Sequence, residues 1–197
     1  MTDLMHRLFL FWSIFPMLFY CPSTKGLWAQ ALNSLNHAAK EHSFILYTEP
    51  DKYSFFKHVL SNALEQIQLA DNLGVYVFSR SQKAFQTFPS FQQMTETKIN
   101  RCCAEIIEKA IDYTYGPFII NGKLINHLTS LPSNIGWGWQ SYSFVLAKPL
   151  GLLVESFEGD FACPLDQQTD DATERIYRMQ QLAQNIESIT LGAATTF

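Results

Sequence analysis

Four segments of the chain carry apolar residues at the spacing of an amphipathic helix, and short β-branched and aromatic runs separate them. We predict an α+β fold in which an antiparallel sheet of about five or six strands has its helices packed on one face. The predicted helices run from Leu27 to Lys40, Thr48 to Leu69, Thr97 to Tyr113 and Asp170 to Leu191. The predicted strands are Leu73 to Phe78, Ala84 to Phe88, Phe118 to Ile120, Tyr142 to Leu146 and Leu150 to Phe157, whereas Ser43 to Thr48 is either a strand or the approach to the next helix.

Turn and capping residues mark several boundaries between these segments. Thr48-Glu49-Pro50-Asp51 has the hydroxyl, carboxylate and proline of a helix start, and Gly116-Pro117 predicts the stop of the third helix. Asn121-Gly122 predicts a turn. The first two strands read as a hairpin, and Leu124 to Trp139 as a long loop. On the last helix we expect an inner face of Ile176, Met179, Leu182, Ala183, Ile186 and Ile189.

Composition limits the classes of partner that the chain can have. Its 197 residues are 47% hydrophobic and 14% aromatic, which suffices for one packed core. The net charge is -4, and the 14 Lys and Arg residues form no basic run. Nucleic acid is therefore not an expected partner.

Motifs for catalysis or metal binding are not found in the sequence. The four cysteines show neither a Cys-x-x-Cys nor a Cys/His zinc spacing, so we expect reduced thiols and no metal site. The five histidines are scattered, and no Gly-x-Ser-x-Gly, P-loop or G-x-G-x-x-G pattern occurs. Asp170, Asp171 and Glu174 are interpreted as first-turn helix charges. We therefore expect no enzymatic activity.

An apolar run, Leu8 to Tyr20, precedes the first predicted helix. It is shorter than the roughly 20 residues that a spanning helix needs, and Pro16 interrupts it. Three interpretations stay open: a membrane-associating segment, a cleaved secretion signal, and an apolar helix packed on the domain. The expected division is an apolar segment (1–26), a helix with its connector (27–50), a domain (51–191) and a tail (192–197). The expected location is the cytoplasm, at a membrane if the run associates with one, and outside the cell if the run is a cleaved signal.

Three stretches occur in an order known from one family of sensor domains. Gln68 to Phe78 places a helix that ends in an Ala-Asp pair before a strand, and Tyr115 to Asn121 places a helix that runs into Gly-Pro before another strand. The paired terminal strands, Ser143 to Leu146 and Leu152 to Glu155, precede a long last helix. Over Asp51 to Leu191 the chain thus resembles a GAF domain, a sensor module of GAF/profilin-like fold.

The resemblance implies binding or sensing without catalysis. The Asn-Lys, Phe and Asp-Glu pattern of cyclic-nucleotide-binding members is not found, and no Cys-His pair precedes the terminal strands as in bilin-binding members. Members that reduce free methionine sulfoxide need cysteines in the loop before those strands, and Leu124 to Ser141 contains none. The cofactor, if there is one, stays unidentified.

Aromatic residues supply the candidate binding site. In Gly136-Trp137-Gly138-Trp139 the rings stand between glycines, so they either cover the core or form the wall of a pocket. His127 lies in the predicted loop and is a candidate ligand contact. The ligand-binding candidates are Phe118, His127, Trp137, Trp139 and Tyr142.

Two functions follow from these observations. The first is a sensory or regulatory domain that encloses a small molecule between its sheet and the loop Leu124 to Tyr142. The second is a protein interaction module whose pocket is filled by Phe78, Phe85 and Phe144. Such a module would pair, with itself as a homodimer or with another protein, through the first and last helices.

Overall fold

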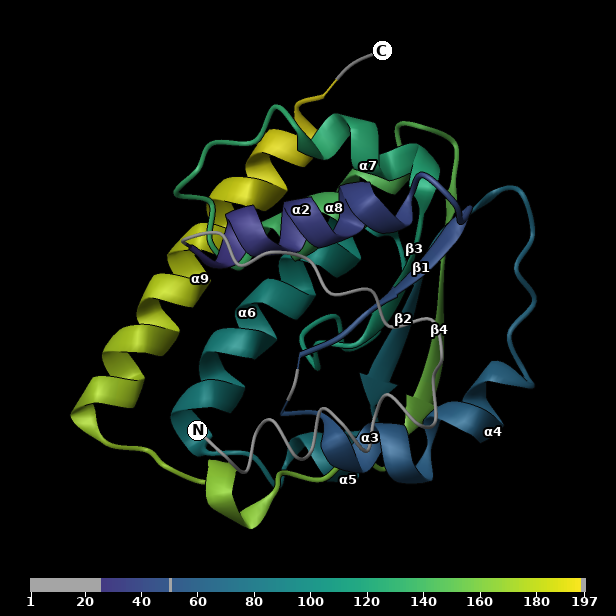
Figure 1. Ribbon diagram of the computed structural model, residues 1–197. Coiled ribbons are helices and arrows are strands. Elements are labelled where there is room, and N and C mark those ends of the chain that lie inside the picture. Colours follow the sequence, from purple (N-terminus) through teal and green to yellow (C-terminus); the bar gives the residue numbers. More distant parts are fainter. Residues whose placement is uncertain (1–25, 50, 196–197) are drawn as a thin grey trace.

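The computed structural model of the protein describes residues 26–49 and 51–195, and it is an α+β domain (Figure 1). The predicted apolar segment Leu8 to Tyr20 therefore lies outside the described residues. The helices of the described part fall short of the length and apolar character required to cross a membrane. The helices are α2 (Leu27–Ala38), α3 (Tyr53–His58), α4 (Leu60–Leu64), α5 (Gln82–Phe85), α6 (Ser90–Ile107), α7 (Gly122–Leu128), α8 (Gly138–Ala147) and α9 (Ala172–Ala193), with a 3₁₀ turn, η1, at Leu165–Gln167.

The described sheet has four strands in the order β1-β3-β2-β4. They are β1 (Phe44–Tyr47), β3 (Phe118–Asn121), β2 (Leu73–Arg80) and β4 (Leu153–Gly159). β3 pairs antiparallel with both of its neighbours, whereas β2 and β4 are parallel. The prediction of an antiparallel sheet of five or six strands is therefore wrong, because one pair is parallel and two of the expected strands are helices.

Strand residues alternate between two apolar layers. Val75 and Val77 share one face of the sheet, because successive side chains of a strand point to opposite faces. They pack in the larger layer, which contains residues of α2, α6, α7, α8 and α9. Phe78 and Ile119 face a smaller layer with Phe55 of α3 and with residues of α4. Helices therefore cover both faces of the sheet, and the expectation of a single covered face is corrected.

The largest difference from the sequence prediction is α8. Tyr142 to Leu146 is not a strand but the middle of this helix, and nine of its ten residues are buried. A helix that is buried all round has no polar face, so its sequence lacks the period that distinguishes a helix from a strand. The predicted loop before it contains α7. Asn121-Gly122, where a turn was predicted, begins this helix instead: the Asn121 side chain caps α7 by accepting a hydrogen bond from the backbone N–H of Lys123, 3.0 Å away.

Other boundaries differ for local reasons. Ser81 caps α5 by accepting a bond from the Ala84 N–H, so the second strand of the predicted hairpin is replaced by helix. The predicted helix from Thr48 to Leu69 is divided into α3 and α4 at Val59. α6 begins before the predicted Thr97 and ends at Ile107, well before Gly116-Pro117. The capping residue Glu108 after it has a left-handed φ of 62°.

α9 turns small and polar residues inward and large apolar residues outward. Ile176, Met179 and Ile186 are 54%, 50% and 36% exposed, so their predicted place on the inner face is wrong. Leu182 and Ile189 pack against the core as predicted. The other buried residues of α9 are Asn185, Ser188 and Gly192.

A close approach of α8 to α9 accounts for this rotation. A Cβ atom on Gly138 would lie 2.0 Å from Ser188 Oγ, and one on Gly192 would lie 3.3 Å from Val145. Small side chains on both helices are therefore needed where they meet. This requirement selects the Ser188 and Gly192 side of α9 as the inner side, at the expense of its larger apolar residues.

Residues 27–49 contribute to the same core as the rest of the domain. α2 forms where it was predicted, and its Trp28 ring stacks on Trp139 with the centroids 5.6 Å apart. Ser43 to Thr48, for which two interpretations were open, contains strand β1, which pairs with β3. The helix and connector are thus packed together with the domain that follows them.

Candidate functional site

A cavity of about 310 Å³ lies at the end of the sheet where β1, β2 and β4 finish. Residues just after β1, the last residue of β2 and the segment before β3 line it, and α6, α8 and α9 close its sides. In open sheets, ligands bind outside the carboxyl ends of strands, so the position is typical of a binding site. Polar residues form much of the wall: Glu49, Lys52, Arg80, Gln92, Glu96, Thr114, Gln140, Ser141, Gln181 and Asn185.

Arg80, the last residue of β2, is the charged centre of this wall. It is 3% exposed, and its guanidinium is held by two carboxylates. Nε donates to Asp112 Oδ2 over 2.5 Å, and Nη2 donates to Glu96 Oε2 over 2.7 Å and to Thr114 Oγ1 over 2.9 Å. A buried ion pair needs such complete hydrogen bonding to offset the loss of hydration. The cluster joins β2, α6 and the segment before β3.

Aromatic rings and charge fix this cluster further. The guanidinium carbon lies 4.7 Å from the ring centre of Phe85 and 4.4 Å from that of Phe88. Burial acts to raise the pKa of Asp112, but the charge and hydrogen bonds of Arg80 outweigh it, so this pKa lies below its ordinary value. Burial acts to lower the pKa of Arg80, and the charges of Glu96 and Asp112 raise it above its ordinary value. Arg80 and Asp112 are thus charged at neutral pH.

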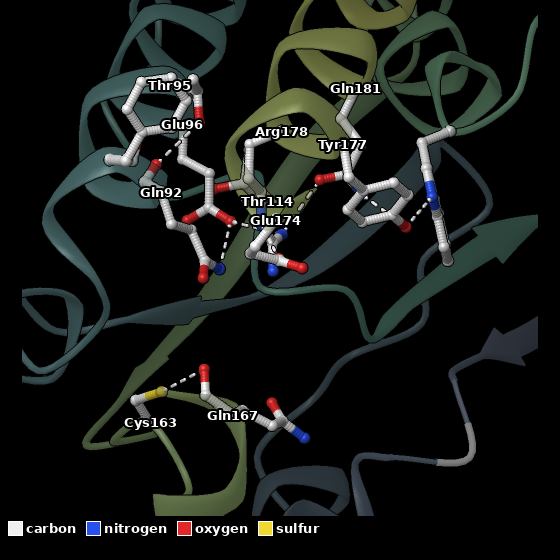
Figure 2. Close-up of polar contacts among 12 residues, drawn as sticks. Gln92, Thr95, Glu96, Thr114, Cys163, Gln167, Glu174, Tyr177, Arg178 and Gln181 are labelled. Carbon is white, nitrogen blue, oxygen red and sulfur yellow. Dashed lines mark hydrogen bonds and ion pairs between the residues drawn. The ribbon is translucent and has the colours of Figure 1, made fainter. Parts of the chain in front are cut away.

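A network of hydrogen bonds and one ion pair connects this cluster to α9 (Figure 2). Gln92 Nε2 donates to Glu96 Oε1 over 2.8 Å. Arg178 Nε donates to Glu174 over 2.7 Å, its Nη1 donates to Gln181 over 3.0 Å, and the same Nη1 lies 3.8 Å from Glu96 Oε1. The polar side of α9 therefore faces polar groups of α6.

Trp137 and Tyr177 form another part of the wall. Trp137 Nε1 donates to Tyr177 Oη over 2.6 Å. Gln181 Nε2 donates to the same oxygen over 3.2 Å, and both Tyr177 and Gln181 are drawn in Figure 2. The backbone N–H of Trp137 donates to Gln184 Oε1 over 3.1 Å. Burial raises the pKa of Tyr177 above its ordinary value, although the bond from Trp137 acts to lower it. The phenol therefore stays neutral.

Glu49 brings a carboxyl group to the cavity that is only partly satisfied. Its Oε1 accepts one bond from Gln140 Nε2 over 3.0 Å, and its Oε2 is buried without a hydrogen-bond partner among the described residues. Gly116 lies against this oxygen, since a Cβ there would be 2.4 Å from it. Burial raises the pKa of Glu49, and the charge of Lys52 and the Gln140 bond lower it by less than burial raises it.

The structure places the five predicted site residues in three environments. Trp137 lines the cavity. Phe118, Trp139 and Tyr142 are buried in the larger apolar layer, where the Phe118 and Trp139 rings lie 5.6 Å apart. His127 is half-buried on α7 rather than in a loop. The structure thus brings only Trp137 into the polar cavity, and Trp139 takes the core position that was the alternative for both tryptophans.

The polar wall residues were missed by sequence reasoning, although a signal for them exists. On α6, Gln92 and Glu96 stand four residues apart on the buried side. On α9, Arg178, Gln181 and Asn185 have the three- and four-residue spacing of one helix face. α9 carries both a polar stripe and an apolar stripe at helical spacing, so the sequence does not show which of the two faces the core. The prediction placed the apolar stripe there, and the polar wall residues were therefore missed.

The cavity is equipped for hydrogen bonding more than for covalent chemistry. The nearby Cys103 is buried, and burial raises its pKa to about 12, so its thiol is a poor nucleophile at neutral pH. Ser141 donates its hydroxyl proton to Asn185, which is no base. Within residues 26–49 and 51–195, His, Cys, Asp and Glu side chains do not gather in threes as metal ligands would. Cys102, Cys103 and Cys163 are free thiols.

No protein-family model, curated protein or solved structure matches the chain. The resemblance to the GAF family therefore stays a prediction from pattern order. None of its three correspondences holds in full. α4 ends at Leu64, before Ala70-Asp71, and α6 ends at Ile107, before Gly116-Pro117. Ser143 to Leu146 belongs to α8 and not to a terminal strand.

Proposed function

We propose that the protein is a non-enzymatic sensory or regulatory domain that binds a small polar molecule in the cavity between α6, α8, α9 and the strand ends. The observation that carries this proposal is the polar wall around a cavity of about 310 Å³. That volume is at the lower end of the range of small-molecule sites. A ligand of metabolite size would replace water at the amide, hydroxyl and carboxyl groups. The cytoplasm remains the proposed location.

The energetic cost of the wall supports a role for it. Arg80, Glu96 and Asp112 are buried, and apolar residues in their place would often stabilise a fold equally well or better. Groups of this kind fix the positions of hydrogen-bonding atoms before a ligand arrives, which lowers the entropic cost of binding.

A screen by thermal unfolding tests the proposal. Gln181 lines the cavity, whereas Gln180 on the same helix is exposed, so Gln181→Phe fills the cavity and Gln180→Phe is its matched control. A library of small polar metabolites should contain a compound that raises the melting temperature of the wild type and the control but not of Gln181→Phe. The proposal is wrong if no compound stabilises the wild type, or if Gln181→Phe responds equally.

A second candidate function, self-association, is favoured by the outer face of α9. Ile176, Met179 and Ile186 are exposed at helical spacing, and Met94 on the adjacent α6 is 49% exposed. Exposed apolar side chains in a row are typical of protein interfaces. Light scattering of the wild type and of Met179→Glu tests this: a dimer that becomes a monomer supports it, and a monomeric wild type contradicts it.

A further inference from the structure

We propose that the ligand of this cavity carries an ammonium group, and that Glu49 is the residue that receives it. The inference rests on the proposed function, since it names the chemical class of the molecule bound. Glu49 lies two residues after the end of β1 and lines the cavity. Its carboxyl group has one hydrogen bond, from Gln140, and one buried oxygen without a partner among the described residues.

The basic groups of the cavity are already engaged. Arg80 is held by Glu96 and Asp112, and Arg178 is held by Glu174. Lys52, the basic residue nearest to Glu49 in sequence, bonds to Asp51 over 2.9 Å and lies 5.4 Å from the Tyr115 ring centre. Because their charge is neutralised by protein carboxylates, these three groups offer little to an anionic ligand.

The charge count favours a cation. Three carboxylates line the cavity, namely Glu49, Asp51 and Glu96, against the three basic groups Lys52, Arg80 and Arg178. Asp112 and Glu174, which hold the two arginines, add two further negative charges behind the wall. The excess of negative charge is met by a positively charged ligand.

The surroundings of Glu49 suit an ammonium group better than a second anion. The phenols of Tyr47, Tyr115 and Tyr177 are near enough for the Glu49 charge to raise their pKa values, together with the larger effect of burial, so they stay neutral. Neutral aromatic rings attract cations through their faces. Gly116, with a φ of 122° and no side chain, leaves room for the carboxyl oxygen beside it.

Three small probes of similar size and different charge test this inference. Propylamine, propanol and propionate are titrated against the wild type, and binding is followed by ligand-observed NMR. Propylamine should bind about tenfold more tightly than the other two, a difference that corresponds to about 1.4 kcal/mol. Its affinity should fall about as much in Glu49→Gln and stay unchanged in Asp170→Asn, which removes an exposed carboxylate of another ion pair.

The pH dependence gives a second, independent readout. Propylamine stays protonated below about pH 10, so a change of affinity at lower pH reports on the protein. The affinity should rise as the pH rises through the elevated pKa of Glu49, and Glu49→Gln should show no such rise. Asp51, Lys52, Tyr115 and Tyr177 line the same cavity, and Tyr47 is close enough for the Glu49 charge to act on its pKa. Glu49→Gln leaves all of these groups in place.

The outcomes separate failure of this inference from failure of the proposed function. Tighter binding of propanol or propionate than of propylamine, abolished by Gln181→Phe, would overturn the ammonium assignment and retain the cavity as a binding site. Propylamine binding that survives Glu49→Gln would overturn the role of Glu49. Absence of binding by all three probes would overturn the inference alone. Binding that is unaffected by Gln181→Phe would overturn the inference and would also count against the cavity as the binding site.

Discussion

Arg80 Nη2 donates to Glu96 Oε2 over 2.7 Å, and this contact joins the end of β2 to the middle of α6. Their side chains are 1% and 8% exposed. The same guanidinium bonds to Asp112, so one residue connects a strand, a helix and the segment that leads into β3. The wall of the candidate site is therefore also a structural joint of the domain.

Arg80→Met should lower the free energy of unfolding by about 3 to 5 kcal/mol, because two buried carboxylates would lose their partner. Chemical denaturation of the wild type and the variant measures this. Arg175→Met, which breaks the exposed pair with Asp170, is the control and should leave the denaturation midpoint unchanged. A comparable loss in both variants would contradict the role given to the buried cluster.

Asp112→Asn should remove part of the acid sensitivity of folding. The folded-state pKa of Asp112 is below its ordinary value of about 3.9, so its contribution to stability is present above that pH and is lost as the pH falls through the folded-state pKa. The wild type should be the more stable protein at pH 7, and its advantage should shrink below about pH 4. Urea denaturation from pH 7 to about pH 3 would disprove this if the difference stayed constant.

Gly138→Ala should destabilise the protein more than Gly192→Ala. The added Cβ at position 138 would lie 2.0 Å from Ser188 Oγ and 2.3 Å from the Gln184 carbonyl oxygen, so α8 and α9 would have to separate. At position 192 the nearest atom is 3.3 Å away. Overpacking of this kind costs about 1 to 3 kcal/mol. Equal melting temperatures of the two variants would show that the helices yield easily here.

Trp139→Ala should cost about 3 to 5 kcal/mol, since its side chain is fully buried and contacts the rings of Trp28 and Phe118. Trp137→Ala should cost less, because Trp137 is half-buried at the cavity. Thermal unfolding of the two variants compares them. The reverse order would exchange the roles of the two tryptophans.

Local patterns sufficed for much of the fold, and failed where the environment of a segment decides its structure. The α+β class, helix α2 and strands β2 and β3 follow from periodicity and composition. α8 was read as a strand because it is apolar on every side. The inner face of α9 depends on the close contact at Gly138, which belongs to another helix.

The site was less predictable than the fold. Glu96 and Asp112, which bond to Arg80, lie 16 and 32 residues after it in the sequence. No short motif connects the three residues. Trp137 was found because glycines on both sides mark it in the sequence. The sequence indicates Glu49 only as part of a helix start, whereas in the structure its carboxyl group lies among the polar residues that line the cavity.

Native mass spectrometry of the protein purified from cells tests most directly whether the cavity is a binding site. The wild type and Gln180→Phe should retain a small molecule, seen as a defined mass above that of the chain, and Gln181→Phe should not. Retention at equal occupancy in all three proteins, or the bare mass of the chain in all three, would contradict the account.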